Sequence, residues 1–390
     1  MLTSSRLVVA KNIIISLVTI FVISLASSNL NSDGLILIST FMLFFNLQNS
    51  LFEGLFGLHL LSIDFNMARK CIARQFKYKI VSSITASVLF YIYLNSVGIE
   101  QLPVGSSFYF FVLIVFLCGL ITNSVMNIYS NVNEVKEFFL LDIVFLLISL
   151  LVLLVYRNVV WVYFLPFLFR TFGSIVIYFR NMSLWKLNGD EDDCKLTSVV
   201  FFSSTVLSVL RDSLFPLVCG YYIGPNIIVL LRIFNTIVSA PGLLASSVNK
   251  VIVRNAQQNK DRALLFNKYI ISLYILSMGY FAIVLVGGER LIRIFFSDKF
   301  NVSFDYLIIS LFLFGIFWPW GQLLMVKSLV LGKSMYYVKI SFYWTVLALI
   351  NFIVLYYTEF TVYIVFFGFM QLLNVVLYVK FSSNANENKK

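Results

Sequence analysis

The sequence predicts an all-α polytopic membrane protein with about twelve transmembrane helices arranged in two six-helix lobes. Hydrophobic residues make up 60% of its 390 residues and charged residues only 12%, and the mean hydropathy is +0.92. A soluble domain averages about 25% charged residues, so this chain could not cover a water-facing surface. Apolar stretches of roughly 20 residues, the length that crosses a bilayer as a helix, recur along the chain. Together these features are typical of a multi-pass membrane protein.

The predicted spans are separated by short polar connectors. Stretches such as 138–156 are apolar on all sides, whereas a membrane β-strand needs about ten residues of strict alternation, so helices are favoured. The second span is longer than the hydrocarbon layer requires, and we expect it to be tilted, broken or extended into the cytoplasm. The spans are 12–30, 35–63, 80–98, 107–128, 138–156, 158–179, 197–220, 223–248, 269–287, 303–326, 337–357 and 360–379.

The positions of lysine and arginine predict the orientation of the chain. With the N-terminus inside, 22 of the 29 Lys and Arg residues fall on cytoplasmic segments, 4 fall on outside loops, and the other 3 lie within spans. Cytoplasmic loops of membrane proteins carry an excess of basic residues. The split therefore predicts cytoplasmic N- and C-termini and an even number of spans. It also accounts for the net charge of +11 without a nucleic-acid partner.

The most polar internal stretch divides the spans into six and six. We predict an N-terminal lobe over 1–182, a cytoplasmic linker over 183–196, a C-terminal lobe over 197–380 and a polar tail over 381–390, with the acidic run Asp190–Asp193 inside the linker. Each half begins with two spans joined by a very short outside turn, and a strongly basic inside loop follows the second span. Such a match implies two lobes in the same orientation, related by an axis along the membrane normal.

The sequence lacks the motifs that most enzymes and metal sites need. The only histidine is His59, and the four cysteines form no pattern with metal-ligand spacing. No phosphate-binding glycine loop, zinc-binding His-x-x-x-His or Gly-x-Ser-x-Gly nucleophile motif occurs. We therefore expect no enzyme activity, no metal and no cofactor, and any transport must draw on a gradient or a partner rather than on ATP bound to this chain.

Charged residues inside the predicted spans are the positive evidence for function. Each costs roughly 2.5–3.5 kcal/mol at mid-helix on insertion scales, so it is expected to face another polar group or a water-filled cavity. Asp142 and Arg170 lie close enough to span ends for their side chains to reach the interface instead. The candidates are Glu53, Asp142, Arg170, Arg211, Asp212 and Arg232.

Polar residues also share one face of the second span. Asn46, Asn49 and Glu53 are spaced i, i+3 and i+7, so on a helix they lie on the same side. That side is expected to look into a cavity, with Asn46 and Asn49 as secondary cavity residues, or into another polar helix through structural hydrogen bonds.

Two arginines stand out because they hold their charge at any physiological pH. Arg211 and Arg232 each require an anion, which is either a carboxylate such as Glu53 or Asp212, in a buried structural ion pair, or a bound phosphate or acidic sugar. Adjacent helical residues point about 100° apart, so Arg211 and Asp212 need not pair with each other. Fixed cations beside titratable acids favour an anionic substrate in a central cavity, with Glu53, Asp212 and Asp142 as candidates for ion coupling or ion pairing.

The segment from Arg211 to about Lys333 resembles the oligosaccharide flippases of the multidrug/oligosaccharidyl-lipid/polysaccharide exporter superfamily. An arginine-bearing span, a basic loop with Lys260, another span and a turn rich in isoleucine and phenylalanine follow one another in the family's order. The early segment Leu60–Arg69 resembles an Asp-x-Gly-x-Gly-Arg element in which Asn66 and Ala68 replace the glycines. The matching stretches are Tyr222-Ile223-Gly224-Pro225, Pro241-Gly242-Leu243-Leu244, Ser246-Ser247-Val248-Asn249 and Glu289-Arg290-Leu291-Ile292-Arg293-Ile294-Phe295-Phe296.

The resemblance implies a MATE-like arrangement that opens alternately on either side of the bacterial inner membrane. For the Wzx-type O-antigen branch, it implies a substrate of undecaprenyl-diphosphate-linked oligosaccharide, moved from the cytoplasmic to the periplasmic leaflet with ion-gradient coupling. Arg211 and Arg232 would contact the diphosphate or acidic sugars. A polysaccharide polymerase and a chain-length regulator are the implied protein partners in lipopolysaccharide biosynthesis.

Two other functions remain open at this point. An O-antigen polymerase has similar size and hydropathy, but it would need a substantial periplasmic loop, and the longest predicted outside loops here are only 95–106 and 287–301. A small-molecule or multidrug exporter of the same superfamily would share the architecture and differ in its resistance phenotype.

Overall fold

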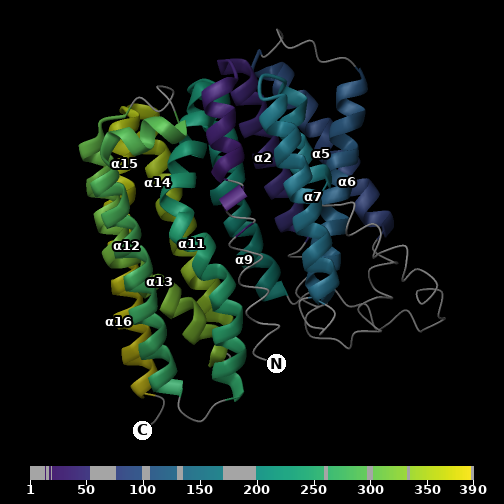
Figure 1. Cartoon of the computed structure of the whole chain (residues 1–390). Coiled ribbons are helices and arrows are strands. Elements are labelled where there is room, and N and C mark those ends of the chain that lie inside the picture. Colours follow the sequence, from purple (N-terminus) through teal and green to yellow (C-terminus); the bar gives the residue numbers. More distant parts are fainter. Residues whose placement is uncertain are drawn as a thin grey trace, which may run out of the picture. The chain divides into compact units, whose positions relative to one another are not determined.

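The computed structural model describes most of the chain, and every regular element in that part is a helix (Figure 1). The described residues are 14, 17, 18, 20–52, 76–98, 106–129, 135–169, 199–258, 262–296, 302–331 and 334–387. The helices are Ile20–Asn29, α2 (Ser32–Phe52), α5 (Phe76–Ser96), α6 (Ser106–Tyr129), α7 (Val135–Val155), η2 (Val160–Phe164), α9 (Val199–Val209), η5 (Leu210–Leu214), α10 (Phe215–Tyr222), α11 (Asn226–Gln258), α12 (Arg262–Phe296), α13 (Phe304–Val330), α14 (Ser334–Tyr357), α15 (Phe360–Met370) and α16 (Leu372–Glu387).

The described helices overlap each of the twelve predicted spans, which confirms the all-α polytopic fold. Six stretches are long and apolar enough by themselves to cross a bilayer, and several shorter apolar helices accompany them. The six are Ser32–Phe52, Phe202–Tyr222, Leu264–Arg290, Phe304–Ser328, Met335–Tyr357 and Phe360–Phe381. Of the second predicted span, 35–63, the part up to Phe52 is helical, and residues 53–63 lie outside the described part.

Local sequence explains where several helices begin and end. The side chain of Asn31 accepts a hydrogen bond of 2.9 Å from the backbone N–H of Gly34, which caps the start of α2. Gly224 adopts φ 135 in the turn between α10 and α11, a conformation that side chains disfavour. In α12 the backbone of Gly288 has φ 60 and ψ −162, so the long helix changes direction there before Glu289.

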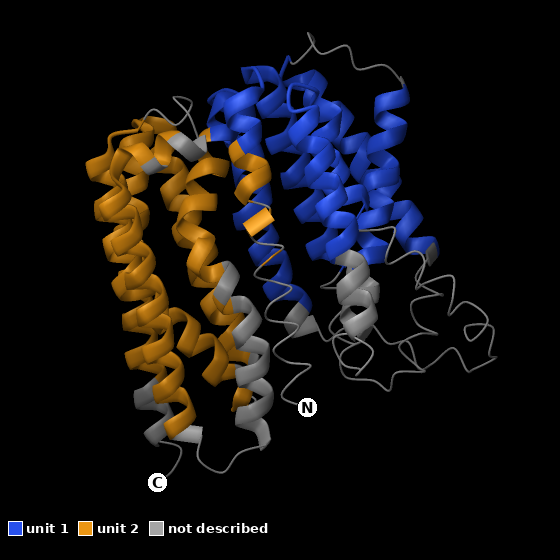
Figure 2. Ribbon diagram, in the orientation of Figure 1, with its two compact units in different colours: residues 1–11, 25–229 blue, residues 12–24, 230–390 orange. Residues whose placement is uncertain are grey.

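Contacts between residues divide the chain into two units (Figure 2). Unit 1 holds residues 1–11 and 25–229, and unit 2 holds 12–24 and 230–390. The helices of the seventh predicted span, α9 and η5, pack against α2 within unit 1. The predicted linker 183–196 lies outside the described residues, so the sequence-based lobe boundaries stay a prediction.

An aromatic cluster forms the centre of unit 1. Phe41 on α2 is fully buried, and its ring stands 4.5 Å from Phe164 and 5.2 Å from Phe116 between centroids. The rings of Phe45, Phe90 and Phe167 lie 5.5 to 6.2 Å from the same ring. Phe41 therefore joins α2 to α5, α6 and the sixth span through a single side chain.

A polar network lies at the centre of unit 2, where α13 packs against α12, α14, α15 and α16. The indole N–H of Trp344 donates to Oδ1 of Asn374 over 3.1 Å, and Nδ2 of Asn374 donates to Oε1 of Gln371 over 3.2 Å. Gln371 and Asn374 are each only 2% exposed. Because both amides are buried and bonded, the network fixes the junction between α15 and α16.

We expect Gly321→Ala to destabilise unit 2. A Cβ on Gly321 would overlap Oδ1 of Asn374, and the bonds to Trp344 and Gln371 prevent that amide from moving aside. Overpacking of this kind typically costs about 1–3 kcal/mol. Thermal unfolding in detergent should show a lower midpoint for Gly321→Ala. Gly279→Ala is the matched control, because a Cβ on Gly279 meets nothing within 4 Å; equal midpoints for the two variants would contradict the prediction.

Candidate functional site

The seventh predicted span contains a single π-helical turn where the charged residues lie. α9 leads into the turn η5, Leu210–Leu214, and α10 continues from Phe215. The backbone N–H of Phe215 donates to the carbonyl of Leu210, five residues earlier, in place of the usual four. Pro216 follows directly and has no N–H to bond the carbonyl of Asp212, so a regular α-turn would be interrupted here. Single π turns inside helices occur frequently at functional sites.

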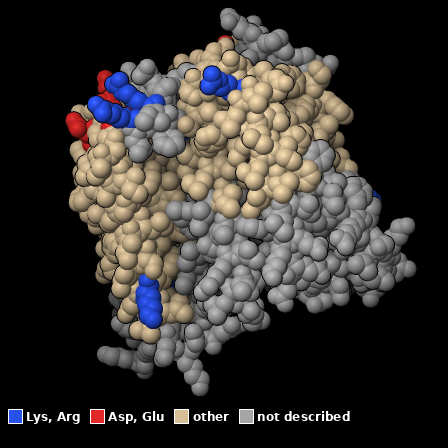
Figure 3. Space-filling model, viewed as in Figure 1, with Lys and Arg blue, Asp and Glu red and all other residues tan. Residues whose placement is uncertain are grey.

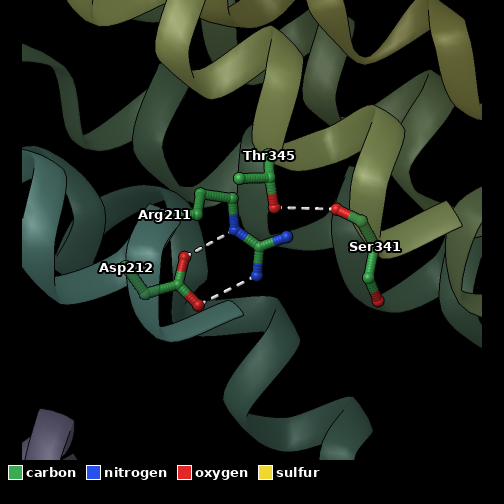
Figure 4. Close-up of polar contacts among 4 residues, drawn as sticks. All are labelled: Arg211, Asp212, Ser341 and Thr345. Carbon is green, nitrogen blue, oxygen red and sulfur yellow. Dashed lines mark hydrogen bonds and ion pairs between the residues drawn. The ribbon is translucent and has the colours of Figure 1, made fainter. Parts of the chain in front are cut away.

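Arg211 and Asp212 form a two-point ion pair within this turn (Figure 4). Nε of Arg211 donates to Oδ1 of Asp212 over 2.6 Å, and Nη2 donates to Oδ2 over 2.9 Å. Sequence analysis named Asp212 as a possible partner but left the pair open, because adjacent residues of an α-helix diverge by about 100°. The structure shows that the pair forms at this π turn, and Asp212 thereby holds the guanidinium in one orientation.

The ion pair is not enclosed by protein. The side chain of Arg211 is 28% exposed and that of Asp212 is 61% exposed, although both lie in the apolar stretch Phe202–Tyr222. Between Arg211 and Pro216, by contrast, Ser213 is buried at 2%. A carboxylate that is open on one side of a membrane-spanning helix requires water or a polar group there, because hydrocarbon would not solvate it.

Hydrogen bonds within unit 1 fix the helix that carries the pair. The hydroxyl of Tyr93 on α5 donates to the carbonyl of Leu217 over 2.7 Å. At the start of α2, the hydroxyl of Ser32 donates to Oδ1 of Asn226 over 3.0 Å. Both hydrogen bonds lie near the start of α2 and the end of α5. The position of η5 is therefore set by its packing against α2 and by these two bonds, which hold the chain that follows η5.

Arg232 lies on α11 in unit 2. It is partly buried, and its neighbours Leu231 and Ile233 are each only 1% exposed. One turn later the hydroxyl of Thr236 donates to the backbone carbonyl of Arg232 over 2.8 Å. A similar bond occurs on α14, where Thr345 donates to the carbonyl of Ser341 over 2.8 Å (Figure 4). Arg211 belongs to unit 1 and Arg232 to unit 2.

The other predicted site residues are placed only in part. Glu53 and Arg170 lie outside the described residues, and Asp142 lies in α7 with its side chain outside the described part. On α2, Asn46 is exposed and Asn49 is 7% exposed. On the predicted polar face of α2, Asn46 is therefore exposed, and Asn49, one helical turn further on, is buried.

Sequence reasoning missed a buried polar seam between α2 and α5. Lys79 is fully buried, although the sequence placed it in a cytoplasmic loop just before the third predicted span. Nε2 of Gln48 donates to the hydroxyl of Ser83 over 2.9 Å, and Ser83 is fully buried too. The spacing Lys79–Ser83, one helical turn, was the available signal.

The molecular surface agrees with a membrane environment for both units. In Figure 3 the charged side chains that are coloured lie toward the ends of the helices, and uncharged surface separates them on this face. Large apolar side chains are exposed along several helices, among them Phe110 at 64% and Val286 at 87%. Apolar exposure on this scale is typical of a surface that lies against lipid or another protein.

No protein-family model matches this sequence, and no curated protein matches it. The solved structures it resembles are transporters. An inward-facing multidrug resistance MATE family transporter of the MOP superfamily aligns with a TM-score of 0.60 at 12% identity, over 96% of each chain. The outward-facing form gives 0.60 at 12% identity, over 96% of this chain and 93% of the other. A MOP superfamily transporter from Pyrococcus furiosus, described as having a binding pocket of reverse polarity, gives 0.59 at 12% identity over 99% of each chain. The chain therefore has the MATE fold.

Proposed function

We propose, from the fold of the MATE transporters, that this protein moves an anionic lipid-linked substrate across a membrane by alternating access. The substrate class we infer is the undecaprenyl-diphosphate-linked oligosaccharide, carried from the cytoplasmic to the periplasmic leaflet of a bacterial inner membrane, with both chain termini in the cytoplasm. The observation that carries the proposal is the open Arg211–Asp212 ion pair in a membrane-spanning helix. A polysaccharide polymerase and a chain-length regulator are the expected partners.

The exposure of the pair supports an aqueous pathway beside η5. A side chain such as Asp212, 61% exposed at this depth, would face hydrocarbon unless water or substrate lay against it. The similarity in fold to both an inward-facing and an outward-facing transporter supports a pathway that opens to one side at a time. A water-filled path that alternates in this way is what a large polar headgroup requires to cross the bilayer.

The chemistry of Arg211 supports an anionic cargo. Guanidinium has five N–H donors in a planar fork, and Asp212 engages Nε and Nη2. Asp212 thus anchors the guanidinium through two parallel bonds, and a planar guanidinium can engage phosphate oxygens in the same two-point manner. Arg232 on α11 would supply a second fixed cation from unit 2. Glu53, Asp142 and Asp212 remain the proposed acids for ion coupling, and Asn46, Asn49 and Arg170 the proposed secondary cavity residues.

A multidrug or small-molecule exporter is the second candidate function, because two of the aligned structures are multidrug resistance transporters. That function would predict drug sensitivity in a deletion strain and an unaltered surface polysaccharide. An O-antigen polymerase is disfavoured by the outside connection between α14 and α15, which consists only of Thr358 and Glu359, and by the short predicted outside loops.

Replacing Arg232 with alanine is expected to reduce substrate movement by roughly 10–100-fold, the loss typical of one hydrogen bond to a charged group. In a strain that lacks this protein, plasmid-borne Arg232→Ala should give sparse, short surface polysaccharide at normal protein levels. Arg157→Ala is the control, since Arg157 is exposed at the outer end of the sixth span. Full polysaccharide from both Arg232→Ala and Arg211→Ala would overturn the role of the cations.

A further inference from the structure

A fully buried lysine lies between two helices of unit 1. Lys79 on α5 is 0% exposed, and its Nζ has no hydrogen-bond partner among the residues that the structure describes. Lysines near the ends of membrane helices normally extend their side chains to the interface, where the ammonium is hydrated. Lys79 does not do so, while Lys77, two residues earlier on the same helix, is exposed.

The contacts of Lys79 do not compensate for a permanent charge. Its Nζ lies 5.9 Å from the ring centroid of Phe52 on α2, at the outer limit of a cation–π contact. Such a contact contributes about 0.5–2 kcal/mol, whereas an isolated buried ammonium costs far more, so an acceptor or a neutral amine is required.

An acceptor without a donor lies one helical turn away. α2 and α5 contact each other along a seam in which Phe52 meets Lys79 and Gln48 meets Ser83. Gln48 and Phe52 are four residues apart on α2, as are Ser83 and Lys79 on α5, so the two contacts are separated by about 6 Å along the helices. Nε2 of Gln48 bonds to Ser83, while its Oε1 is buried with no donor in the described structure. A lysine side chain is long enough to reach it.

The described surroundings contain no carboxylate that could hold Lys79 permanently charged. On α2 the only ionisable group is Asp33, in the first turn at the opposite end of the helix from Phe52. On α6, which also packs against α5, the ionisable groups with described side chains are Tyr109 and Cys118. On α10, which Tyr93 contacts near the far end of α5, they are Cys219, Tyr221 and Tyr222. On α5 itself, Lys77 and Tyr78 are exposed, and Tyr91 and Tyr93 lie three or more turns away.

We propose that Lys79 is a proton-exchanging group in the α2–α5 seam, with Oε1 of Gln48 as the acceptor for its protonated form. The exchange is a simple one: an Nζ–H bond breaks, the electron pair stays on nitrogen, and the proton passes to water. A proton can bind to a buried amine without a cavity, so this exchange is compatible with the close packing of α2 against α5. A role for this proton exchange in driving transport rests on the proposed function, whereas the exchange itself does not.

The seam is placed to influence the charged turn. α2 packs against α5 on one side and against η5, which carries Arg211 and Asp212, on another. The protonated amine requires a hydrogen bond to α2, whereas the neutral amine does not, so proton occupancy changes how α2 and α5 are held together. Because α2 also packs against η5, a shift of α2 relative to α5 would alter the position of η5, and all three elements belong to unit 1.

Proton counting in the absence of substrate tests the exchange. Detergent-solubilised wild type, Lys79→Met and Lys77→Met are titrated potentiometrically between about pH 5 and pH 9, a range in which an ordinary lysine stays charged. We expect Lys79→Met to exchange one proton fewer per chain than wild type, and Lys77→Met to match wild type. An unchanged count in Lys79→Met overturns the proposal; Lys79→Gln serves as a second variant if the methionine form does not fold.

The pH profile of transport tests the coupling role. In proteoliposomes with lipid-linked oligosaccharide, we expect Lys79→Met to lose the dependence of rate on pH, Lys79→Arg to be inactive with its fixed charge, and Lys77→Met to behave as wild type. A wild-type pH profile in Lys79→Met, with loss of the dependence in Glu53→Gln instead, would overturn the coupling role and assign it to the acid. If wild type moved no oligosaccharide, the proposed function would fail, while the proton count would still decide the fate of Lys79.

Discussion

Removing either member of the Arg211–Asp212 pair is expected to reduce transport by about 100-fold, equivalent to about 2.7 kcal/mol. Arg211→Ala removes the cation that would hold the substrate phosphate. Asp212→Ala leaves the cation but frees it to rotate, because the bonds of 2.6 and 2.9 Å are what orient the guanidinium. Stability should change little, since a partly exposed ion pair contributes at most about 1 kcal/mol. Flipping of a fluorescent lipid-linked oligosaccharide in proteoliposomes measures the effect.

The double variant distinguishes one functional unit from two independent residues. If Asp212 acts only by orienting Arg211, the variant with both residues changed to alanine is no slower than Arg211→Ala alone. The control is a second ion pair of the same chain, in which Nη2 of Arg293 lies 2.8 Å from Oε1 of Glu289 with both side chains more than half exposed. Alanine at both Glu289 and Arg293 should leave transport intact. If the fold-losses of transport in the two single variants multiply in the Arg211/Asp212 double variant, the positioning role of Asp212 is contradicted.

Replacing Phe41 with alanine is expected to lower the stability of unit 1 by about 3–5 kcal/mol, the range for a buried phenylalanine. Phe41 is fully buried and contacts rings from three other helical segments, so its loss opens a cavity that α2 could fill only by moving. Unfolding in mixed detergent, followed by tryptophan fluorescence and circular dichroism, gives the free-energy change.

Phe110 provides a matched control for Phe41. It lies on α6 and is 64% exposed, so alanine there exchanges a lipid contact and leaves no internal cavity. We expect Phe110→Ala to change stability by less than about 1 kcal/mol. Similar losses for the two alanine variants would mean that the aromatic cluster around Phe41 does not determine the stability of unit 1.

The sequence predicted the helices well because apolar length and charge placement act locally. A stretch such as 304–330 is too apolar to be anything but a buried or spanning helix, and α13 occupies it. The turn at Gly224 also follows from local chemistry, since a glycine and Pro225 end one helix and begin the next. These features depend on neighbouring residues alone, and they could be predicted without knowledge of packing.

The details of the candidate site depend on packing and could be predicted only in part. Arg211 was predicted as a charged residue within a span, with Asp212 as one possible carboxylate partner, but regular α-helical geometry left a bond between these neighbours open. The π turn before Pro216 departs from that geometry. Lys79 was assigned to a loop because a basic residue beside a span normally faces water. Its burial follows from the pairing of α2 with α5, which hydropathy does not encode. The roles of Glu53, Asp142 and Arg170 remain predictions.

Two of the boundaries between the units fall inside helices that the structure describes. One lies between Ser24 and Leu25, within Ile20–Asn29, and another between Val229 and Leu230, within α11. A helix with all its backbone bonds in place bends gently but does not fold like a loop. At these two points the chain therefore passes from one unit to the other through continuous helix and not through a flexible loop.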